Sequence, residues 1–446
     1  MSIIRKAFFG KPAQCGKPVI IDFNSMLQNN PVVFYNFGQE DYIKRGYSQN
    51  AEVYKIIKKI TDKCAISVPY LYIDNGDVKS RKYRNFRQSS VATEHIKKNL
   101  WVAKALEYAD EGEQLSKLLK QPNEYQSWIE MIELFRIFYF VQGEAFLIRE
   151  TADDKGLAVS LSVAPANMMR HEVGGDGQIS RWILDLGRGK SRTFEGDDLK
   201  DVFQLKMANP NFDPSGTHLR GMSPLLAGLK YLQLDDYSLE AWLKSMQNEG
   251  AKGIVSPNHN NPDLWLTEPQ VKATEERVEQ KIHGAHNKNK VVVSGMPLQY
   301  TQIGLSPDAL NIIQGMDAAQ VRLCDLWGVP PVLFNPEPTY ANQPVAAKRL
   351  VNDVILPYLN KEEDALNRWL VEPFAIAENK KFIIDYDTSL FDELRPTDDE
   401  IKALERKTSL NELRVMLGYD EYESGDKDPA DMIFIQSGFV PLDDFN

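Results

Sequence analysis

The chain has 446 residues, of which 43% are hydrophobic and 26% charged, so it is long enough for several domains with buried cores. Its formal net charge of −11 argues against a protein that grips nucleic acid through many phosphate contacts, because such proteins are usually basic. The sequence predicts neither a secretory signal nor a membrane span, and its three cysteines are too far apart for a metal-ligand motif or a disulfide framework.

The first 221 residues predict an α+β domain. Apolar residues from Val53 to Cys64 recur at helical spacing, which indicates a helix beginning at Asn50. Asn123 is expected to cap a second helix that ends near Val141. The strongly basic residues 78–98 indicate a solvated loop or helix face, or else a contact with acidic protein or DNA. Short strands are expected over residues 70–73, 143–148, 160–163, 179–186 and 201–205.

A long helix is expected over residues 222–249, because Ser223 is a favoured cap and Pro224 is a favoured first helical residue. Leucines spaced three and four residues apart form one apolar stripe, which by itself suits an ordinary core helix. A second apolar flank suits a helix wedged between neighbours, as in a ring. This flank comprises Tyr231, Leu234, Ala241 and Trp242, and the remaining polar edge comprises Lys230, Gln233, Glu240, Lys244 and Gln247.

Residues 250–305 predict a small α/β insert between two long helices. Strands are expected over residues 253–256 and 291–294, with a charged helix from 267 to about 283 between them. A second long helix is expected over residues 306–328, where Ser306-Pro307 repeats the start signature of the first, and Gly315 inside it indicates a bend or a close helix approach. The lysines of the insert that we expect to be exposed are Lys281, Lys288 and Lys290.

The second long helix is expected to end at Gly328, and two prolines then forbid its continuation. A further helix is expected from Pro344 to about Val371, with a kink between Asp353 and Pro357, because an interior proline removes a backbone hydrogen bond. The loop between them, residues 329–343, contains no lysine or arginine, and its polar residues include Asn335, Thr339, Tyr340, Asn342 and Gln343. A strand over residues 381–385 and short helices over 396–407 and 410–417 complete the prediction.

Catalytic motifs are absent from the sequence: it has no phosphate-binding P-loop, no zinc-protease His-Glu-x-x-His and no Gly-x-Ser-x-Gly elbow. One acidic group suggests an alternative. Asp385 and Asp387 share one face of the expected strand, and Asp398, Asp399 and Glu400 follow. Such carboxylates could hold magnesium for phosphodiester cleavage, whereas Asp398 and Asp399 also suit an ordinary helix start. We predict no catalytic residue, no metal and no cofactor.

A set of motifs, taken in order, resembles the portal (head-to-tail connector) proteins of tailed double-stranded-DNA bacteriophages, of the siphophage type. The resemblance covers about residues 221–417. Each motif is weak alone, and the order of the set carries the resemblance. The motifs are Gly221-Met-Ser-Pro224, Gly250-Ala-Lys-Gly253, Ile303-Gly-Leu-Ser-Pro-Asp308, Gly328-Val-Pro-Pro331, Thr339-Tyr-Ala-Asn342, Ile355-Leu-Pro357 and Asn411-Glu-Leu-Arg414.

The resemblance implies a portal fold, in which the segments predicted above take family roles. These are an α+β wing (1–221), a first stem helix (222–249), a clip (250–305), a second stem helix (306–328), a tunnel loop (329–343), a kinked wing helix with a strand (344–395) and a short helical, crown-like C-terminal region (396–446). The polar edge of the first stem helix and the tunnel loop would face a DNA channel, and the clip lysines would dock partners.

The function that the resemblance implies is structural. About twelve copies would form a closed ring at one capsid vertex, through which DNA is packaged and ejected. The implied partners are double-stranded DNA, the terminase large subunit, a head-completion or tail adaptor and the major capsid protein, with no membrane. The protein would reside in the virion, and in the host cytoplasm during assembly. The alternatives are a metal-dependent nuclease that uses the acidic group and a virion scaffold or adaptor that forms no ring.

Overall fold

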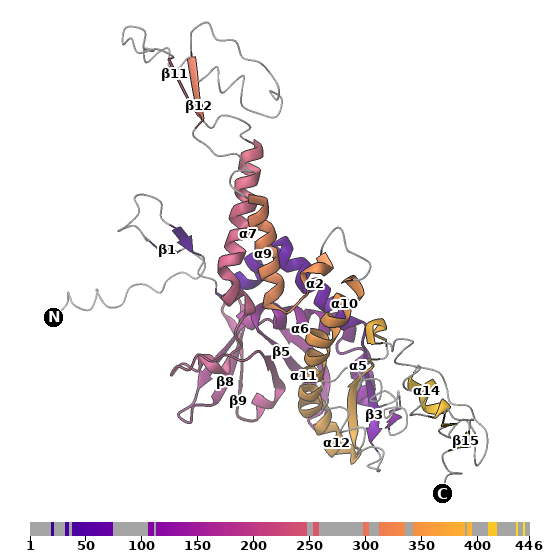
Figure 1. Ribbon diagram of the computed structural model, residues 1–446. Coiled ribbons are helices and arrows are strands. Elements are labelled where there is room, and N and C mark those ends of the chain that lie inside the picture. The colour runs from indigo at the N-terminus through magenta and orange to yellow at the C-terminus, as the bar shows by residue number, and fades with distance from the viewer. Residues whose placement is uncertain are drawn as a thin grey trace, which may run out of the picture. The chain divides into compact units, whose positions relative to one another are not determined.

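The computed structural model describes residues 19–21, 32–34, 38–74, 106–110, 113–247, 253–257, 298–302, 312–334, 342–388, 390–394, 409–416, 434–435 and 440–441. The chain divides into two compact units. Unit 1 comprises Met1–Gly16, Phe37–Ala227 and Cys324–Asn446, and unit 2 comprises Lys17–Asn36 and Gly228–Leu323. Helices and strands are mixed along the chain, as the predicted α+β class requires (Figure 1). Within the described residues, no helix is long and apolar enough to cross a membrane.

Three antiparallel sheets of three strands each contain most of the described β-structure of unit 1. Their strand orders are β13(Phe382–Tyr386)-β3(Pro69–Asp74)-β4(Leu106–Tyr108), β10(Val202–Lys206)-β5(Glu144–Ala152)-β6(Ala158–Ala164) and β7(Met169–Val173)-β8(Ile179–Gly187)-β9(Lys190–Glu195). Phe382 pairs with Ile73, although more than three hundred residues separate them in the sequence. The C-terminal part of the chain therefore completes a sheet that the N-terminal part begins.

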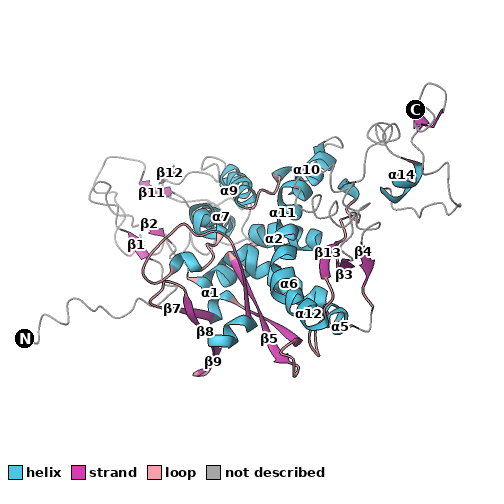
Figure 2. Ribbon diagram, turned by 90° about the horizontal axis from the view of Figure 1, so that it is seen from below, coloured by secondary structure: helices cyan, strands magenta, loops and turns pink. Residues whose placement is uncertain are grey.

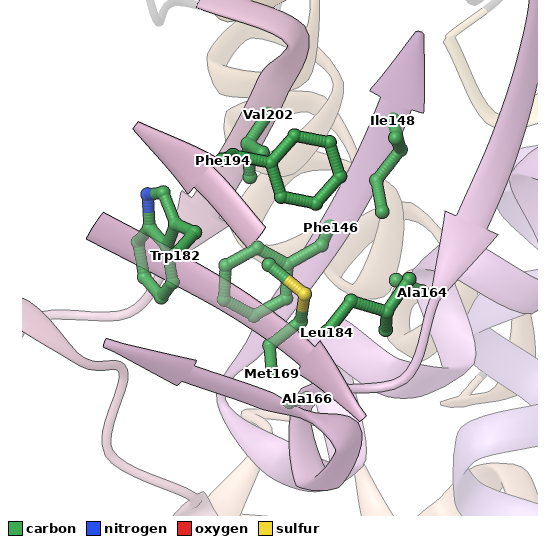
Figure 3. Packing of buried hydrophobic residues seen from close by; sticks show 9 residues of the cluster. All are labelled: Phe146, Ile148, Ala164, Ala166, Met169, Trp182, Leu184, Phe194 and Val202. Carbon is green, nitrogen blue, oxygen red and sulfur yellow. The ribbon is translucent and has the colours of Figure 1, made fainter. Parts of the chain in front are cut away.

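A hydrophobic cluster holds the β5 sheet against the β8 sheet (Figure 3). Alternate residues of a strand point to one face, so Phe146 and Ile148 of β5 enter the cluster together, as Trp182 and Leu184 of β8 do. The rings of Phe146 and Trp182 meet edge to face with their centroids 5.0 Å apart. The other members of the cluster are Ala164, Ala166, Met169, Phe194 and Val202.

Two long helices of unit 1 begin at residues whose side chains cap them. Asn50 accepts a 2.9 Å hydrogen bond from the backbone N–H of Val53 and starts α2 (Ala51–Ala65), as predicted. The prediction that Asn123 caps the next long helix is wrong, because α6 (Trp128–Gln142) begins at Ser127. Ser127 and Glu130 form a reciprocal capping box. Asn123 instead accepts from the N–H of Gln126 and donates to the carbonyl of Leu161.

The last long helical segment of unit 1 is interrupted by two π-helical turns. It runs through α10 (Asn342–Leu350), a π turn at Val351–Ile355, α11 (Leu356–Leu366), a π turn at Asn367–Val371 and α12 (Glu372–Glu378). Each π turn precedes a proline, Pro357 or Pro373, whose ring removes a regular helical hydrogen bond. The kink predicted between Asp353 and Pro357 falls at the first π turn, Val351–Ile355. The segment begins before Pro344 and continues past Val371, so the predicted helix was too short at both ends.

A buried ion pair joins two helices and a strand in the core of unit 1. Arg136 of α6 donates to both carboxylate oxygens of Glu362 of α11, over 3.1 Å from Nε and 2.8 Å from Nη2. The hydroxyl of Tyr386, on β13, donates to the same carboxylate. Burial and the charge of Glu362 raise the pKa of Tyr386 well above its usual value, so its hydroxyl stays protonated as a donor. Both charged side chains are 1% exposed or less.

Unit 2 contains two helices that run side by side (Figure 1, Figure 2). They are α7 (Pro224–Gln247), which begins in unit 1, and α9 (Ile312–Leu326). A Cβ atom on Gly315 of α9 would lie 3.5 Å from Oγ of Ser238 of α7, so Gly315 marks the close helix approach that the sequence indicated. Between the helices in the sequence, β11 (Gly253–Pro257) pairs with β12 (Leu298–Gln302), a strand that was not predicted.

The remaining elements are short. They are β1 (Val19–Ile21), β2 (Val32–Phe34), α1 (Gln39–Asp41), a π-helical turn at Tyr42–Ser48, α5 (Gln114–Lys120), α14 (Leu410–Met416), β14 (Phe434–Ile435), β15 (Val440–Pro441) and 3-10 turns at Ala166–Met168, Gly196–Asp201, Thr217–Leu219, Pro331–Phe334 and Asp392–Leu394. The basic segment 78–98, the clip helix 267–283, the strand 291–294 and the helix 396–407 lie outside the described residues.

Candidate functional site

The loop predicted over residues 329–343 leaves α9 through a left-handed helix cap. Gly328 has a φ of 69°, and the N–H of Val329 donates to the carbonyl of Cys324 over 3.1 Å. This bond over five residues is the signature of a Schellman cap, and Cys324 and Val329 are both buried, as its apolar contact requires. The predicted helix end at Gly328 is confirmed.

The structure also describes the first and the last residues of this loop. After Pro330, a 3-10 turn at Pro331–Phe334 continues the chain, and the Phe334 ring lies 5.2 Å from Nζ of Lys55. The chain is described again from Asn342, which with Gln343 is exposed in the first turn of α10. The other three predicted loop residues, Asn335, Thr339 and Tyr340, lie outside the described residues.

The predicted polar edge of α7 is only partly exposed. Lys230 and Glu240 are exposed, whereas Gln233 is 5% exposed and departs from the edge on which the sequence placed it. It directly follows Leu232, which is fully buried. For the other two members, Lys244 and Gln247, no side chain is described. Lys281, Lys288 and Lys290 lie outside the described residues.

Large apolar side chains are exposed along α7 in the single chain. Leu234 and Tyr237 lie on the side of the helix opposite the buried Leu232, because successive residues are about 100° apart. This face includes part of the second apolar flank that the sequence predicted. A row of exposed apolar residues this long on one helix is typical of a surface that another protein covers. The exposed members of this face are Leu226, Tyr231, Leu234 and Tyr237, between 39% and 45% accessible, whereas Leu239 and Leu243 are exposed on the same side of the helix as Leu232.

The start of α7 is held in place by a buried carboxylate. Glu144 of β5 is fully buried and accepts hydrogen bonds from Nε of Arg220 (2.7 Å), from Gln204 (2.7 Å) and from the backbone N–H of Gly221 (2.9 Å). Arg220 also donates to the carbonyl of Ala166, in the turn before β7, and to that of Met169, the first residue of β7. The Gly-Met-Ser-Pro motif is therefore positioned by the strand and by the sheet beside it. Sequence reasoning identified this motif and missed the residues that hold it.

The acidic group that suggested a nuclease is not assembled in the described part of the chain. Asp385 is buried in β13, 3% exposed, and the hydroxyl of Ser67 donates to the backbone carbonyl of Asp387 over 2.7 Å. Among the residues that the structure describes, no group of three or more His, Cys, Asp or Glu side chains could hold a metal ion. Asp398, Asp399 and Glu400 lie outside the described residues.

Solved structures and curated proteins include several chains that are similar to this one. A chain in the neck of an empty gene transfer agent (GTA) particle, computed with C6 symmetry, has a TM-score of 0.59 at 20% identity, covering 92% of this chain and 98% of that one. A chain in the neck of the native particle, computed with C12 symmetry, has the same TM-score at 19% identity, covering 92% and 97%. An uncharacterized protein of Rickettsia bellii (strain RML369-C) is 24% identical over 325 residues, covering 70% of this chain and 79% of that protein.

The family assignment comes from the sequence itself. The family model described as "Phage portal protein" matches residues 93–410, more than half of the chain and nearly all of the region where the ordered motifs occur. Portal proteins are structural and not enzymatic, so the nuclease alternative is wrong. The predicted resemblance is confirmed: this chain belongs to the phage portal protein family.

Proposed function

We propose that this chain forms a ring of about twelve copies in the neck of a virion, at one capsid vertex, and that DNA enters and leaves the capsid through its channel. The observation that carries the proposal is the family match over residues 93–410. The structural relatives support it, because they come from particle necks computed with C6 and C12 symmetry. The protein would also be present in the host cytoplasm during assembly.

The exposed face of α7 supports ring formation by a second argument. In a closed ring each subunit contacts two neighbours through two different surfaces, so a helix at the interface needs apolar residues on more than one side. Leu232 is buried within the chain, while Leu234 and Tyr237 point away from it and remain exposed. We propose that a neighbouring copy of this chain covers them.

The mass of the native protein tests the ring. Light scattering coupled to size exclusion should give about a dozen times the 50.8 kDa of one chain. A protein that stays monomeric at all concentrations and salt conditions, with capsid protein present as well, would contradict the ring. That result would favour the remaining alternative, a virion scaffold or adaptor that does not form a ring.

The loop from Val329 to Gln343 is proposed as the constriction around DNA. It contains no lysine or arginine, so it can touch the duplex through hydrogen bonds and van der Waals contact without holding phosphates by charge. The candidate residues are Asn335, Thr339, Tyr340, Asn342 and Gln343, and on the first stem helix Lys230, Glu240, Lys244 and Gln247. Gln233 is left out of this proposal because it is buried.

Lysines introduced into this loop should slow DNA translocation. In Asn335→Lys with Thr339→Lys, each copy of a ring would add two cations near the phosphates. Counterion release would then hold the duplex, and more strongly at low salt than at high salt. Single-molecule packaging velocity measures the effect. Tyr340→Ala or Asn342→Ala should leave rings intact and lower the retained DNA length.

A matched control tests whether the position of the added charges, and not only their number, slows translocation. Val159 and Leu186 are exposed residues of unit 1, 49% and 58% accessible, and both lie outside the loop. Val159→Lys with Leu186→Lys adds the same two charges per chain and should package at the parental velocity. Normal velocity and normal genome length in the loop variants would show that the loop is not the constriction.

The insert over residues 250–305 is proposed as the docking end for the terminase large subunit and for a head-completion or tail adaptor. In the sequence it lies between two long helices, and Lys281, Lys288 and Lys290 give it the charged residues that suit an exchangeable interface. The major capsid protein would bind elsewhere on the ring, and we assign no residues to that contact.

A further inference from the structure

The described residues on the two sides of the proposed loop meet within unit 1. The 3-10 turn at Pro331–Phe334, through which the chain enters the loop, contacts α10, the helix that follows the loop. A Cβ atom added to Gly328 would lie 3.4 Å from Cγ2 of Val354, in the π turn after α10. The segment before the loop therefore packs against the segment after it. We refer to residues 328–334 and 342–355 as the loop base.

The helix α2, from the other end of the chain, contacts the loop base as well. It packs against the π turn Val351–Ile355, in which Val351 and Ile355 are fully buried. On α2 the apolar residues Val53 and Ile57 are fully buried too. The loop base is thus built on a helix that lies far from it in the sequence.

Lys55 of α2 connects this helix to the entrance of the loop. Its Nζ atom lies 5.2 Å from the centroid of the Phe334 ring and 2.6 Å from Oε2 of Glu52, which is one turn earlier on the same helix. An ammonium group over an aromatic ring is attracted by the negative face of the ring. The carboxylate of Glu52 orients the ammonium, so the half-buried Phe334 is held over α2.

A second lysine of α2 makes the same kind of contact beside α10. Nζ of Lys63 lies 5.8 Å from the centroid of the buried Phe391 ring and 2.7 Å from Oε1 of Glu393. The 3-10 turn Asp392–Leu394, directly after Phe391, contacts α10. Two turns that contact α10 are thus each connected to α2 by a lysine and a phenylalanine.

The thiol of Cys324 lies close to the first of these contacts. Burial raises the pKa of Cys324 to about 12, while the charge of Lys55 lowers this pKa and the charge of Glu52 raises it. Both charges therefore lie near the sulfur atom. Because Cys324 also accepts the cap hydrogen bond from Val329, its side chain is a natural probe of the loop base.

We propose that α2 holds the loop base in place, and that Lys55 and Phe334 are the positioning residues that fix where the chain enters the loop. This holding is a property of the single chain. Its consequence for DNA rests on the proposed function of the loop: a constriction whose entrance is not fixed should hold the packaged duplex less well.

The rate at which Cys324 reacts with N-ethylmaleimide tests the proposal in the full-length chain. Lys55→Met keeps a long side chain and removes the cation, and we expect it to raise the alkylation rate of Cys324 about tenfold by opening the loop base. Loss of the Lys55 charge alone would raise the pKa of Cys324 and slow the reaction, so a faster reaction reports opening. Mass spectrometry of the peptides gives the rate at each cysteine.

Cys64 is an internal control in the same molecule. It is fully buried in α2, and its rate should not change. Lys58→Met is the matched control variant, because Lys58 pairs with Asp62 over 2.9 Å on an exposed part of the same helix. That variant should react at the parental rate, and so should Lys55→Arg, which keeps the cation over the ring.

Phe334→Leu is the second test, since it removes the aromatic ring and keeps an apolar side chain. It should raise the Cys324 rate as Lys55→Met does. Parental Cys324 rates in both variants would overturn the proposal. An equal rise at Cys64 would contradict it as well, because the change would then lie in the stability of the whole fold.

The DNA retained in assembled particles separates this proposal from the function proposed for the loop. Particles that carry Lys55→Met should retain less DNA than particles that carry Lys58→Met. If the Cys324 rate rises and DNA retention stays at the parental level, α2 holds the loop base, and the loop is not the constriction.

Discussion

Replacing Arg136 with methionine should lower the free energy of unfolding by about 3–5 kcal/mol, because Glu362 is then left buried without its charged partner. The carboxylate is fully buried and receives two hydrogen bonds from Arg136, and the hydroxyl of Tyr386 cannot replace a positive charge. The effect should be large because the pair, together with Tyr386, joins α6 to α11 and β13, which follow it by more than two hundred residues in the sequence. Urea denaturation followed by circular dichroism measures the change.

Two further variants test whether the burial of the ion pair causes the large loss of stability. Arg170 and Asp185 form an ion pair on the surface of the β8 sheet, with side chains 71% and 39% exposed. Arg170→Met should therefore cost less than about 1 kcal/mol, since solvent screens such pairs. Combining Arg136→Met with Glu362→Leu should recover much of the loss, because no unpaired charge remains. A loss for Arg136→Met no larger than for Arg170→Met would refute this account of the core.

Local signals in the sequence were enough to find most helices. α2 follows from the spacing of Val53, Ile57 and their neighbours, and its cap Asn50 is where the pattern begins. The end of α9 follows from Gly328 and the prolines after it, since no other residue type fits a left-handed cap followed by a break as well. These features depend on residues within a few positions of one another, so the sequence alone is enough to predict them.

Long-range pairing could not be predicted in the same way. β3 pairs with β13, and nothing in Tyr70–Ile73 identifies a partner more than three hundred residues away. β7 and β9 were missed because they lie on a half-exposed sheet and carry charged residues such as Arg170 and Lys190, which hide the alternating pattern. The helix start was predicted at Asn123, and the capping box of Ser127 and Glu130, a stronger signal that the sequence also contains, was missed.

Two features of the candidate site could be predicted from the sequence. The cap at Gly328 and the exposed flank of α7 were both found from spacing and residue type. The burial of Gln233 could not be predicted. A glutamine next to a buried leucine is expected to be exposed unless the segment that covers it is known. The hydrogen bond from Trp327 to the carbonyl of Phe140 could not be predicted either, because it joins residues that are close only in the folded chain.

Placing carboxylates at Leu234 and Tyr237 should convert the ring into single chains. In the proposed assembly a neighbouring copy covers both residues, so Leu234→Asp with Tyr237→Asp would bury two charges without partners at every interface. The two side chains are 41% and 42% exposed in one chain, so the fold itself should tolerate the change, which circular dichroism checks. Light scattering should then report 50.8 kDa instead of a multiple of it.

Leu186→Asp is the control: it adds a carboxylate at a leucine that is 58% exposed outside α7, and its rings should keep the parental mass. Full-mass rings in the double variant would mean that this face of α7 is not the contact between copies.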